Sequence, residues 1–167
     1  MNVATVEKSL APKAPHLDQE QIAAWRAFLR SHSLMLRQID ADLAEAGLPP
    51  LGWYDVLWAL HEAPGNHLQP SALADAIVLS RSGLTRMVDR LEDAGLVLRR
   101  ACPGDRRGIH VELTEEGAEM LERMWPVYAR GIEDHFLPAL GEHACTLRKA
   151  MESVAQSVRR PAGADGS

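Results

Sequence analysis

The stretch that decides the fold runs from Leu79 to Leu113 and reads LSRSGLTRMVDRLEDAGLVLRRACPGDRRGIHVEL. In its first half, apolar side chains recur at intervals of three and four residues, at Leu84, Met87, Val88 and Leu91. This spacing places them on one side of an α-helix, which predicts a helix over about residues 81–94. Ser80 fits the N-cap of this helix, and Gly95 fits the left-handed stop that follows it.

The opposite side of this predicted helix is polar and basic. Its outward positions include Arg81, Ser82, Thr85 and Arg86. Arginine forks can bind guanine edges and hydroxyl groups can bind phosphate oxygens, so this side suits a nucleic-acid groove. Asp89 and Arg90 lie on the same helix. For these two residues, pairing with neighbouring side chains is as good an interpretation as a contact with nucleic acid.

Beyond this helix the pattern changes to an alternation of period two, which is typical of β-strands. Leu96–Leu98 and Ile109–Leu113 therefore predict two strands that are joined by a long loop. The loop carries Arg106 and Arg107 at its tip, where no apolar neighbour covers them. A basic hairpin tip of this kind can lie along a phosphate backbone or enter a minor groove.

A short helix is predicted at Ser71–Ala76, just before the helix at 81–94. The two have the spacing of a helix-turn-helix, in which the second helix reads the DNA. Upstream, Gly52–Glu62 shows helical periodicity and ends at a Pro-Gly pair. We predict that these helices and the hairpin form one winged helix-turn-helix module over residues 51–113.

Long helices are predicted on both sides of this module. Residues 17–46 begin with Asp18 as N-cap and Gln21 three residues later, which is the pattern of a capping box. Residues 114–158 begin at Thr114, and both segments carry apolar positions at three-four spacing. One small core cannot use all of this apolar surface, so we predict that these segments are dimerisation helices.

The composition favours one globular domain. The chain has 167 residues, of which 46% are hydrophobic and 25% are charged, enough for one core. We expect a single domain over 17–158, a mobile arm at 1–16 and a disordered tail at 159–167. Because no apolar run resembles a membrane span or a signal peptide, we expect a cytoplasmic protein with no membrane partner.

The charge distribution is compatible with a nucleic-acid partner although the formal net charge is -5. Residues 78–110 hold seven arginines and four acids, a local excess of three positive charges. Positive charge gathered on one module is what phosphate binding requires. Of the two arginines on the hairpin stem, Arg99 and Arg100, strand alternation allows only one to share the outer face.

The sequence offers little to support enzymatic or metal chemistry. It contains no glycine-rich phosphate loop, nucleophile elbow or clustered metal ligands, so we expect no enzyme, no cofactor and no metal. Cys102 and Cys145 lie too far apart to indicate a disulfide framework. We expect Cys145 to be buried on the last helix, and Cys102 to be either a redox-responsive thiol or a small loop residue.

Two motifs resemble the MarR family of bacterial transcriptional regulators. The triplet Asp105-Arg106-Arg107, followed by a strand that ends in Leu113-Thr114 and then by Gly117, is similar to the wing signature of that family. The run SRSGLTRMVDRLEDAGLV resembles its recognition helix over the whole length. The order of the predicted elements extends the resemblance over about residues 18–158.

The resemblance implies a mainly α fold with a small β-hairpin wing, namely a homodimeric winged helix-turn-helix protein with long N- and C-terminal dimerisation helices. It implies that Arg107 inserts in the minor groove and that Asp105 orients the wing. The expected DNA-binding residues are Ser80, Arg81, Ser82, Thr85, Arg86, Asp105, Arg106 and Arg107. Two-fold symmetry would require double-stranded DNA with a palindromic operator, whose half-sites lie about 10 bp apart.

Members of the family that this sequence resembles often bind a small aromatic acid beside the dimerisation helices. We expect Trp25, His32 and Trp53 to line such a pocket, while a place in the core or the dimer interface is the competing interpretation. The function expected is a repressor whose DNA binding is modulated by a small aromatic ligand. The alternatives are a winged-helix dimer that serves as a protein-interaction scaffold, and a cysteine-based redox-responsive regulator.

Overall fold

The computed structural model describes residues 16–77, 81–101 and 108–159. The predicted arm at 1–16 and tail at 159–167 lie almost wholly outside these residues. The chain divides into two compact units, residues 1–34 and 35–167. The division falls inside the first helix, so the expectation of one domain over 17–158 stays a prediction.

Helix α1 spans Gln19–Glu45 and begins with the capping box that the sequence predicts. The backbone N–H of Gln21 donates to Asp18 Oδ1 at 2.7 Å, and the backbone N–H of Asp18 donates to Gln21 Oε1 at 3.0 Å. Each residue thus satisfies a free amide at the helix start, which stabilises the first turn. In its second half, α1 buries Ile39 and Leu43.

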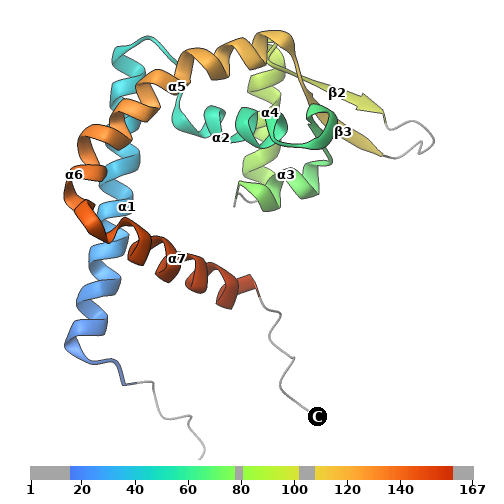
Figure 1. The fold of residues 1–167 in the computed structure, drawn as a ribbon. Coiled ribbons are helices and arrows are strands. Elements are labelled where there is room, and N and C mark those ends of the chain that lie inside the picture. The colour runs from blue at the N-terminus through green and yellow to red at the C-terminus, as the bar shows by residue number, and fades with distance from the viewer. Residues whose placement is uncertain (1–15, 78–80, 102–107, 160–167) are drawn as a thin grey trace, which may run out of the picture. The chain divides into compact units, whose positions relative to one another are not determined.

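Three helices form the helix-turn-helix module: α2 (Leu51–His61), α3 (Pro70–Ala76) and α4 (Arg81–Asp93). In Figure 1 they group beside the hairpin of β2 and β3, and each contacts at least one of the other helices. Their apolar stripes meet in one core, as the three-four spacing predicts. The fully buried side chains that they contribute include Val56, Leu57, Leu60, Leu73 and Leu91.

The sheet has three antiparallel strands in the order β1-β3-β2. Strands β2 (Val97–Ala101) and β3 (Ile109–Leu113) form the predicted hairpin stem, with Val97 opposite Leu113 and Arg99 opposite Val111. The sequence did not predict β1 (His67–Leu68), which pairs with β3. Two residues are too few to show an alternation, so only the pairing with β3 reveals this strand.

Helix α5 (Glu115–His135) is anchored to the turn that follows α4. Thr114 is its N-cap, because Thr114 Oγ1 accepts from the backbone N–H of Gly117 at 3.0 Å and donates to the carbonyl of Gly95 at 2.8 Å. The backbone N–H of Thr114 donates to the carbonyl of Leu96 at 3.2 Å. Gly117 is buried against this turn, and a Cβ on it would lie 2.2 Å from the carbonyl oxygen of Leu96.

The C-terminal part of the predicted segment 114–158 is interrupted twice after α5. It is divided into α6 (Leu137–Leu140), a 3₁₀ turn at Gly141–His143 and α7 (Ala144–Arg159). Gly141 has a φ of +51°, a left-handed conformation that ends α6. The expectation that Cys145 is buried is wrong, because Cys145 is exposed in the first turn of α7.

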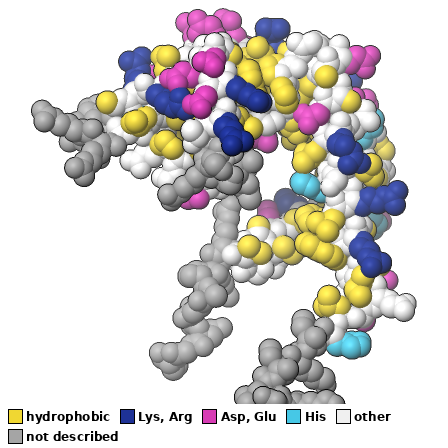
Figure 2. Space-filling model, turned by 180° about the vertical axis from the view of Figure 1, so that it is seen from behind, with side chains coloured by type: hydrophobic (Ala, Val, Ile, Leu, Met, Phe, Trp, Pro, Cys, Tyr) yellow, Lys and Arg dark blue, Asp and Glu magenta, His cyan; other side chains and the backbone are white. Residues whose placement is uncertain are grey.

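Several large apolar side chains are exposed on the helices outside the module. Within α1 they include Trp25, Phe28 and Leu29, and on α7 they include Val154 and Val158. Figure 2 shows hydrophobic side chains at the surface of α7. In the part of the chain that is described, no helix has the length and apolarity needed to cross a membrane.

Candidate nucleic-acid interface

Helix α4 turns one face to the core and the other to solvent. Leu84, Val88 and Leu91 are at most 3% exposed, whereas Thr85 and Arg86 are exposed on the opposite side. The predicted division between a buried stripe and a polar face is therefore confirmed. Arg86 makes no ion pair with any described residue, so its guanidinium is available to a ligand.

The other predicted DNA-binding residues fall where the structure gives no side-chain description. Arg81 and Ser82 form the first turn of α4, but their side chains lie outside the described part of the chain. Ser80 and the wing-tip residues Asp105, Arg106 and Arg107 lie outside the described residues altogether. Their roles stay predictions, and the structure describes only the helix and the strands from which they extend.

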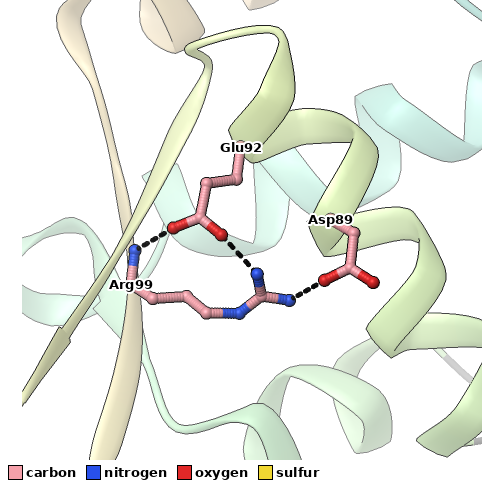
Figure 3. A network of polar contacts seen from close by, with 3 residues as sticks. All are labelled: Asp89, Glu92 and Arg99. Atoms are coloured by element: carbon pink, nitrogen blue, oxygen red, sulfur yellow. Dashed lines mark hydrogen bonds and ion pairs between the residues drawn. The ribbon is translucent and has the colours of Figure 1, made fainter.

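Arg99 on β2 lies in a network with two carboxylates of α4 (Figure 3). Arg99 Nη2 donates to Asp89 Oδ1 at 2.6 Å, and Nη1 donates to Glu92 Oε2. Burial alone would lower the pKa of Arg99, but its hydrogen bonds with Asp89 and Glu92 outweigh burial and raise that pKa. The guanidinium is therefore permanently charged and committed to the protein itself.

Arg100 points to a different partner, as strand alternation predicts. Its Nε lies 2.6 Å from Glu112 Oε2, and His110 Nε2 lies 3.9 Å from the same oxygen. The ring of His110 in turn contacts the ring of His67 on β1, with 4.6 Å between their centres. Both stem arginines are thus paired within the protein, and neither is a simple unpaired phosphate contact.

Asp89 does pair within the protein, but its partner is Arg99 on β2 and not a neighbour on α4. Arg90 differs, since it makes no ion pair with another described residue. Sequence reasoning missed the role of Glu92, which accepts from both the backbone N–H and the guanidinium of Arg99. No local signal could reveal it, because Glu92 lies seven residues from its partner and on a different element.

A pocket of about 290 Å³ adjoins this network, between α3, α4 and the two hairpin strands. Val88 and Val111 form part of its apolar wall, and Thr85 and Arg99 supply polar groups. Ile109 also lines it and remains 51% exposed. The packing between α4 and the hairpin is therefore incomplete beside Arg99 and Ile109.

The three predicted ligand-binding residues belong to different units. Trp25 and His32 belong to the unit of residues 1–34. In that unit the centre of the Phe28 ring lies 5.9 Å from the ring centre of Trp25 and 6.1 Å from that of His32. Trp53 lies in the other unit, half-buried against the core. The structure therefore does not test whether the three line one pocket.

A second aromatic cluster lies between α2 and α5. Tyr54 is its centre, with ring centres 6.1 Å from Trp58, 6.4 Å from Trp125 and 4.8 Å from Tyr128. Burial raises the pKa of Tyr54 to about 12, and the charges of Tyr128 and Asp55 add to this rise. Both tyrosines therefore stay neutral hydroxyl groups at physiological pH.

The carboxylate of Asp55 acts on both tyrosines of this cluster. Burial raises the pKa of Asp55, and the neighbouring carboxylate of Asp40 raises it further. Burial raises the pKa of Tyr128, and the charge of Asp55 raises that pKa further.

Among the described residues, no three His, Cys, Asp or Glu side chains gather as a metal site would require.

Together, a helix-turn-helix with a polar second helix and a hairpin beside it define a winged helix-turn-helix protein, a class that binds DNA. Comparison with known proteins names the family. The MarR family model matches residues 46–108. The crystal structure of AbsC, a MarR family transcriptional regulator from Streptomyces coelicolor, is 33% identical, with 87% of this chain and 99% of that chain covered and a TM-score of 0.78. This chain therefore belongs to the MarR family of transcriptional regulators.

Two further relatives support this assignment. Sco3205, a MarR family transcriptional regulator from Streptomyces coelicolor solved in complex with DNA, is 30% identical and has a TM-score of 0.81. The match covers 92% of this chain and 96% of that chain. The HTH-type transcriptional regulator PecS from Dickeya dadantii is 26% identical over 92% of this chain and 93% of its own length.

Proposed function

We propose that this protein is a homodimeric repressor that binds a palindromic operator through α4 and the wing and thereby occludes a promoter. The observation that carries the proposal is the exposed polar face of α4, where Arg86 has no ion-pair partner among the described residues. A long apolar stripe holds the other face of α4 in the core, so this face is rigidly presented. The similarity to Sco3205, which was solved with DNA, supports the same assignment.

The proposed dimer is supported by the apolar side chains that single chains leave exposed. Trp25 in α1 is 59% exposed, and Val154 and Val158 on α7 are 53% and 79% exposed. Apolar side chains that recur on one side of a helix and face water mark an interaction surface. A second copy would bury them and would place two α4 helices in successive major grooves.

The experiment that tests the proposed function is a gel shift with the intergenic DNA upstream of the protein's own gene. We expect a defined shifted complex at low nanomolar to micromolar protein, with affinity that falls steeply as salt rises. A shuffled fragment of equal length is the control. If the folded dimer shifts neither fragment at low ionic strength, the repressor proposal fails and a protein-interaction scaffold becomes the better interpretation.

Replacing Arg86 with Ala should weaken operator binding by roughly 10-fold to 100-fold, because a bidentate contact to guanine contributes about 1–3 kcal/mol of discrimination. Binding to the shuffled fragment should change much less. The measurement is a titration of both fragments by fluorescence anisotropy. Arg123→Ala is the matched control, since Arg123 is an exposed arginine on α5 and should not affect DNA binding. An equal loss with both fragments would make Arg86 a phosphate contact without base readout.

The proposed repressor further responds to a small aromatic ligand bound near Trp25, His32 and Trp53. The aromatic cluster around Tyr54, the sequence neighbour of Trp53, supports an aromatic ligand on the Trp53 side, since rings and neutral hydroxyl groups suit an aromatic molecule. Asp55 would repel the carboxylate of an aromatic acid, so we expect that group to lie away from the cluster. Arg37 on α1 is exposed and is one candidate to pair with it.

Titration of a panel of aromatic acids, neutral phenols and aromatic amines should identify the ligand class. Binding should quench tryptophan fluorescence and raise the midpoint of thermal unfolding, and the shift should grow with ligand concentration. Replacing Trp53 with Leu should weaken the response while the operator affinity of the free protein persists. If no member of the panel changes either signal, these aromatic residues serve only the core and the interface.

A further inference from the structure

Arg99 connects the hairpin to α4 by three hydrogen bonds. Two come from its guanidinium, which donates to Asp89 and to Glu92. The third comes from its backbone, whose N–H donates to Glu92 Oε1 at 3.0 Å. Figure 3 shows the side chain extended from the strand toward the carboxylates of Glu92 and Asp89.

Apolar packing between the hairpin and α4 leaves a gap beside Arg99. Val97 at the base of β2 is fully buried, but further along the stem lies the pocket of about 290 Å³ that Val88, Arg99 and Ile109 line. A space without side chains contributes no dispersion contacts between its walls. The polar links of Arg99 therefore supply a connection that packing leaves out.

The geometry of these links suits an orienting role better than a stabilising one. The side chains of Arg99, Asp89 and Glu92 are 30%, 54% and 34% exposed, and ion pairs exposed to this degree contribute little to the free energy of unfolding. A planar guanidinium that binds two carboxylates three residues apart on one helix, however, permits only a narrow range of orientations. Such a link restricts rotation of the hairpin about the axis of its own stem.

We propose that Arg99 is a positioning residue, which holds the wing at a fixed orientation to α4 so that both meet DNA as one rigid body. The DNA part of this inference rests on the proposed function and deepens it. Arg99 itself does not bind phosphate, because Asp89 and Glu92 occupy its guanidinium. Removing the guanidinium of Arg99 makes the wing more mobile relative to α4. DNA binding is then weaker, because a mobile wing loses conformational entropy when it binds.

The first measurement needs no DNA. Hydrogen exchange is followed in the free protein at the backbone amides of β2, in wild type and in Arg99→Met, which keeps the aliphatic stem and loses the guanidinium. We expect faster exchange at Arg99 and its neighbours in the variant and little change in α2. Arg100→Met is the matched control, because Arg100 pairs with Glu112 on the hairpin itself and not with α4. Equal exchange in wild type and Arg99→Met would overturn the proposal.

The second measurement is operator affinity at several salt concentrations, well below the unfolding midpoint. Arg99→Met should weaken binding about tenfold, the size of a typical coupling energy, with an unchanged salt slope. In an Asp89→Asn, Glu92→Gln background, the same change should have less than about a twofold effect, because the link is already absent. Arg99→Lys should recover only part of the affinity, since an ammonium group cannot bridge both carboxylates.

The opposite pattern would overturn the proposal. A phosphate contact would lower the salt slope by about one, would act equally in both backgrounds and would be largely restored by Lys. If the wild-type protein binds no DNA, the proposed repressor function fails, while hydrogen exchange still decides whether Arg99 positions the wing.

Discussion

Replacing Gly117 with Ala should destabilise the protein by about 3 kcal/mol, the upper end of what overpacking a core usually costs. The reason is a backbone contact: a Cβ at this position would lie 2.2 Å from the carbonyl oxygen of Leu96. That oxygen also accepts from the backbone N–H of Thr114 at 3.2 Å, so it cannot move away without breaking a bond. The thermal midpoint should fall by roughly 6–12 °C.

A matched variant separates the contact from ordinary glycine effects. Gly95 has a φ of +75° and no atom within 4 Å of its hypothetical Cβ, so Gly95→Ala tests backbone strain alone and should cost about 1 kcal/mol. Thermal and urea unfolding of both variants give the comparison. Equal losses in the two proteins would mean that the close approach of α5 to the turn at Leu96 carries no special cost.

The second large effect concerns assembly: Val154→Glu on α7 should convert the proposed dimer into monomers and weaken operator binding by at least about 100-fold. Val154 is 53% exposed in the single chain and lies on the same side of α7 as Leu147, Met151 and Val158. Burying an unpaired carboxylate in an apolar interface costs several kcal/mol. Loss of the second binding module then removes the gain in affinity that comes from linking two half-site contacts.

The state of assembly is measured by analytical ultracentrifugation, and operator affinity is measured on the same samples. Gln156→Glu is the control, because Gln156 is exposed on the opposite side of α7 and should leave both quantities unchanged. If Val154→Glu remains a dimer with normal affinity, this face of α7 is not the dimer interface. If it becomes monomeric and still binds the full operator normally, the two-fold mode of binding is wrong.

Short-range patterns were enough to predict several elements of this chain. The capping box of Asp18 and Gln21, the buried stripe of α4 and the cap at Thr114 all depend on residues three or four positions apart, and all three are confirmed. From the sequence, the motif that includes Gly117 indicates only a resemblance to a family signature. The packing of α5 against the turn at Leu96 explains why that position has no side chain.

Other features could not be predicted because their partners are distant in the chain or lack a pattern. Strand β1 consists of His67 and Leu68 and exists only through its pairing with β3. The break at Gly141 separates Leu140 from α7, although the apolar spacing from Leu140 to Met151 is that of one continuous helix. The roles of Ser80, Asp105, Arg106 and Arg107 rest on the sequence, since these residues lie outside the described ones.

For the two stem arginines, local sequence patterns predict the face of the strand but not the partner of each side chain. Alternation along β2 sends Arg99 and Arg100 to opposite faces, and this follows from the period of any strand. Which carboxylates they meet depends on how α4 crosses the hairpin, because Asp89 and Glu92 lie ten and seven residues before Arg99. Periodicity acts within one element, whereas the choice between a phosphate contact and an internal ion pair requires two elements packed together. The sequence alone was thus enough to predict the helices, the hairpin and the polar face of α4. Only the packing of these elements decided that Arg99 forms ion pairs within the protein and not a phosphate contact.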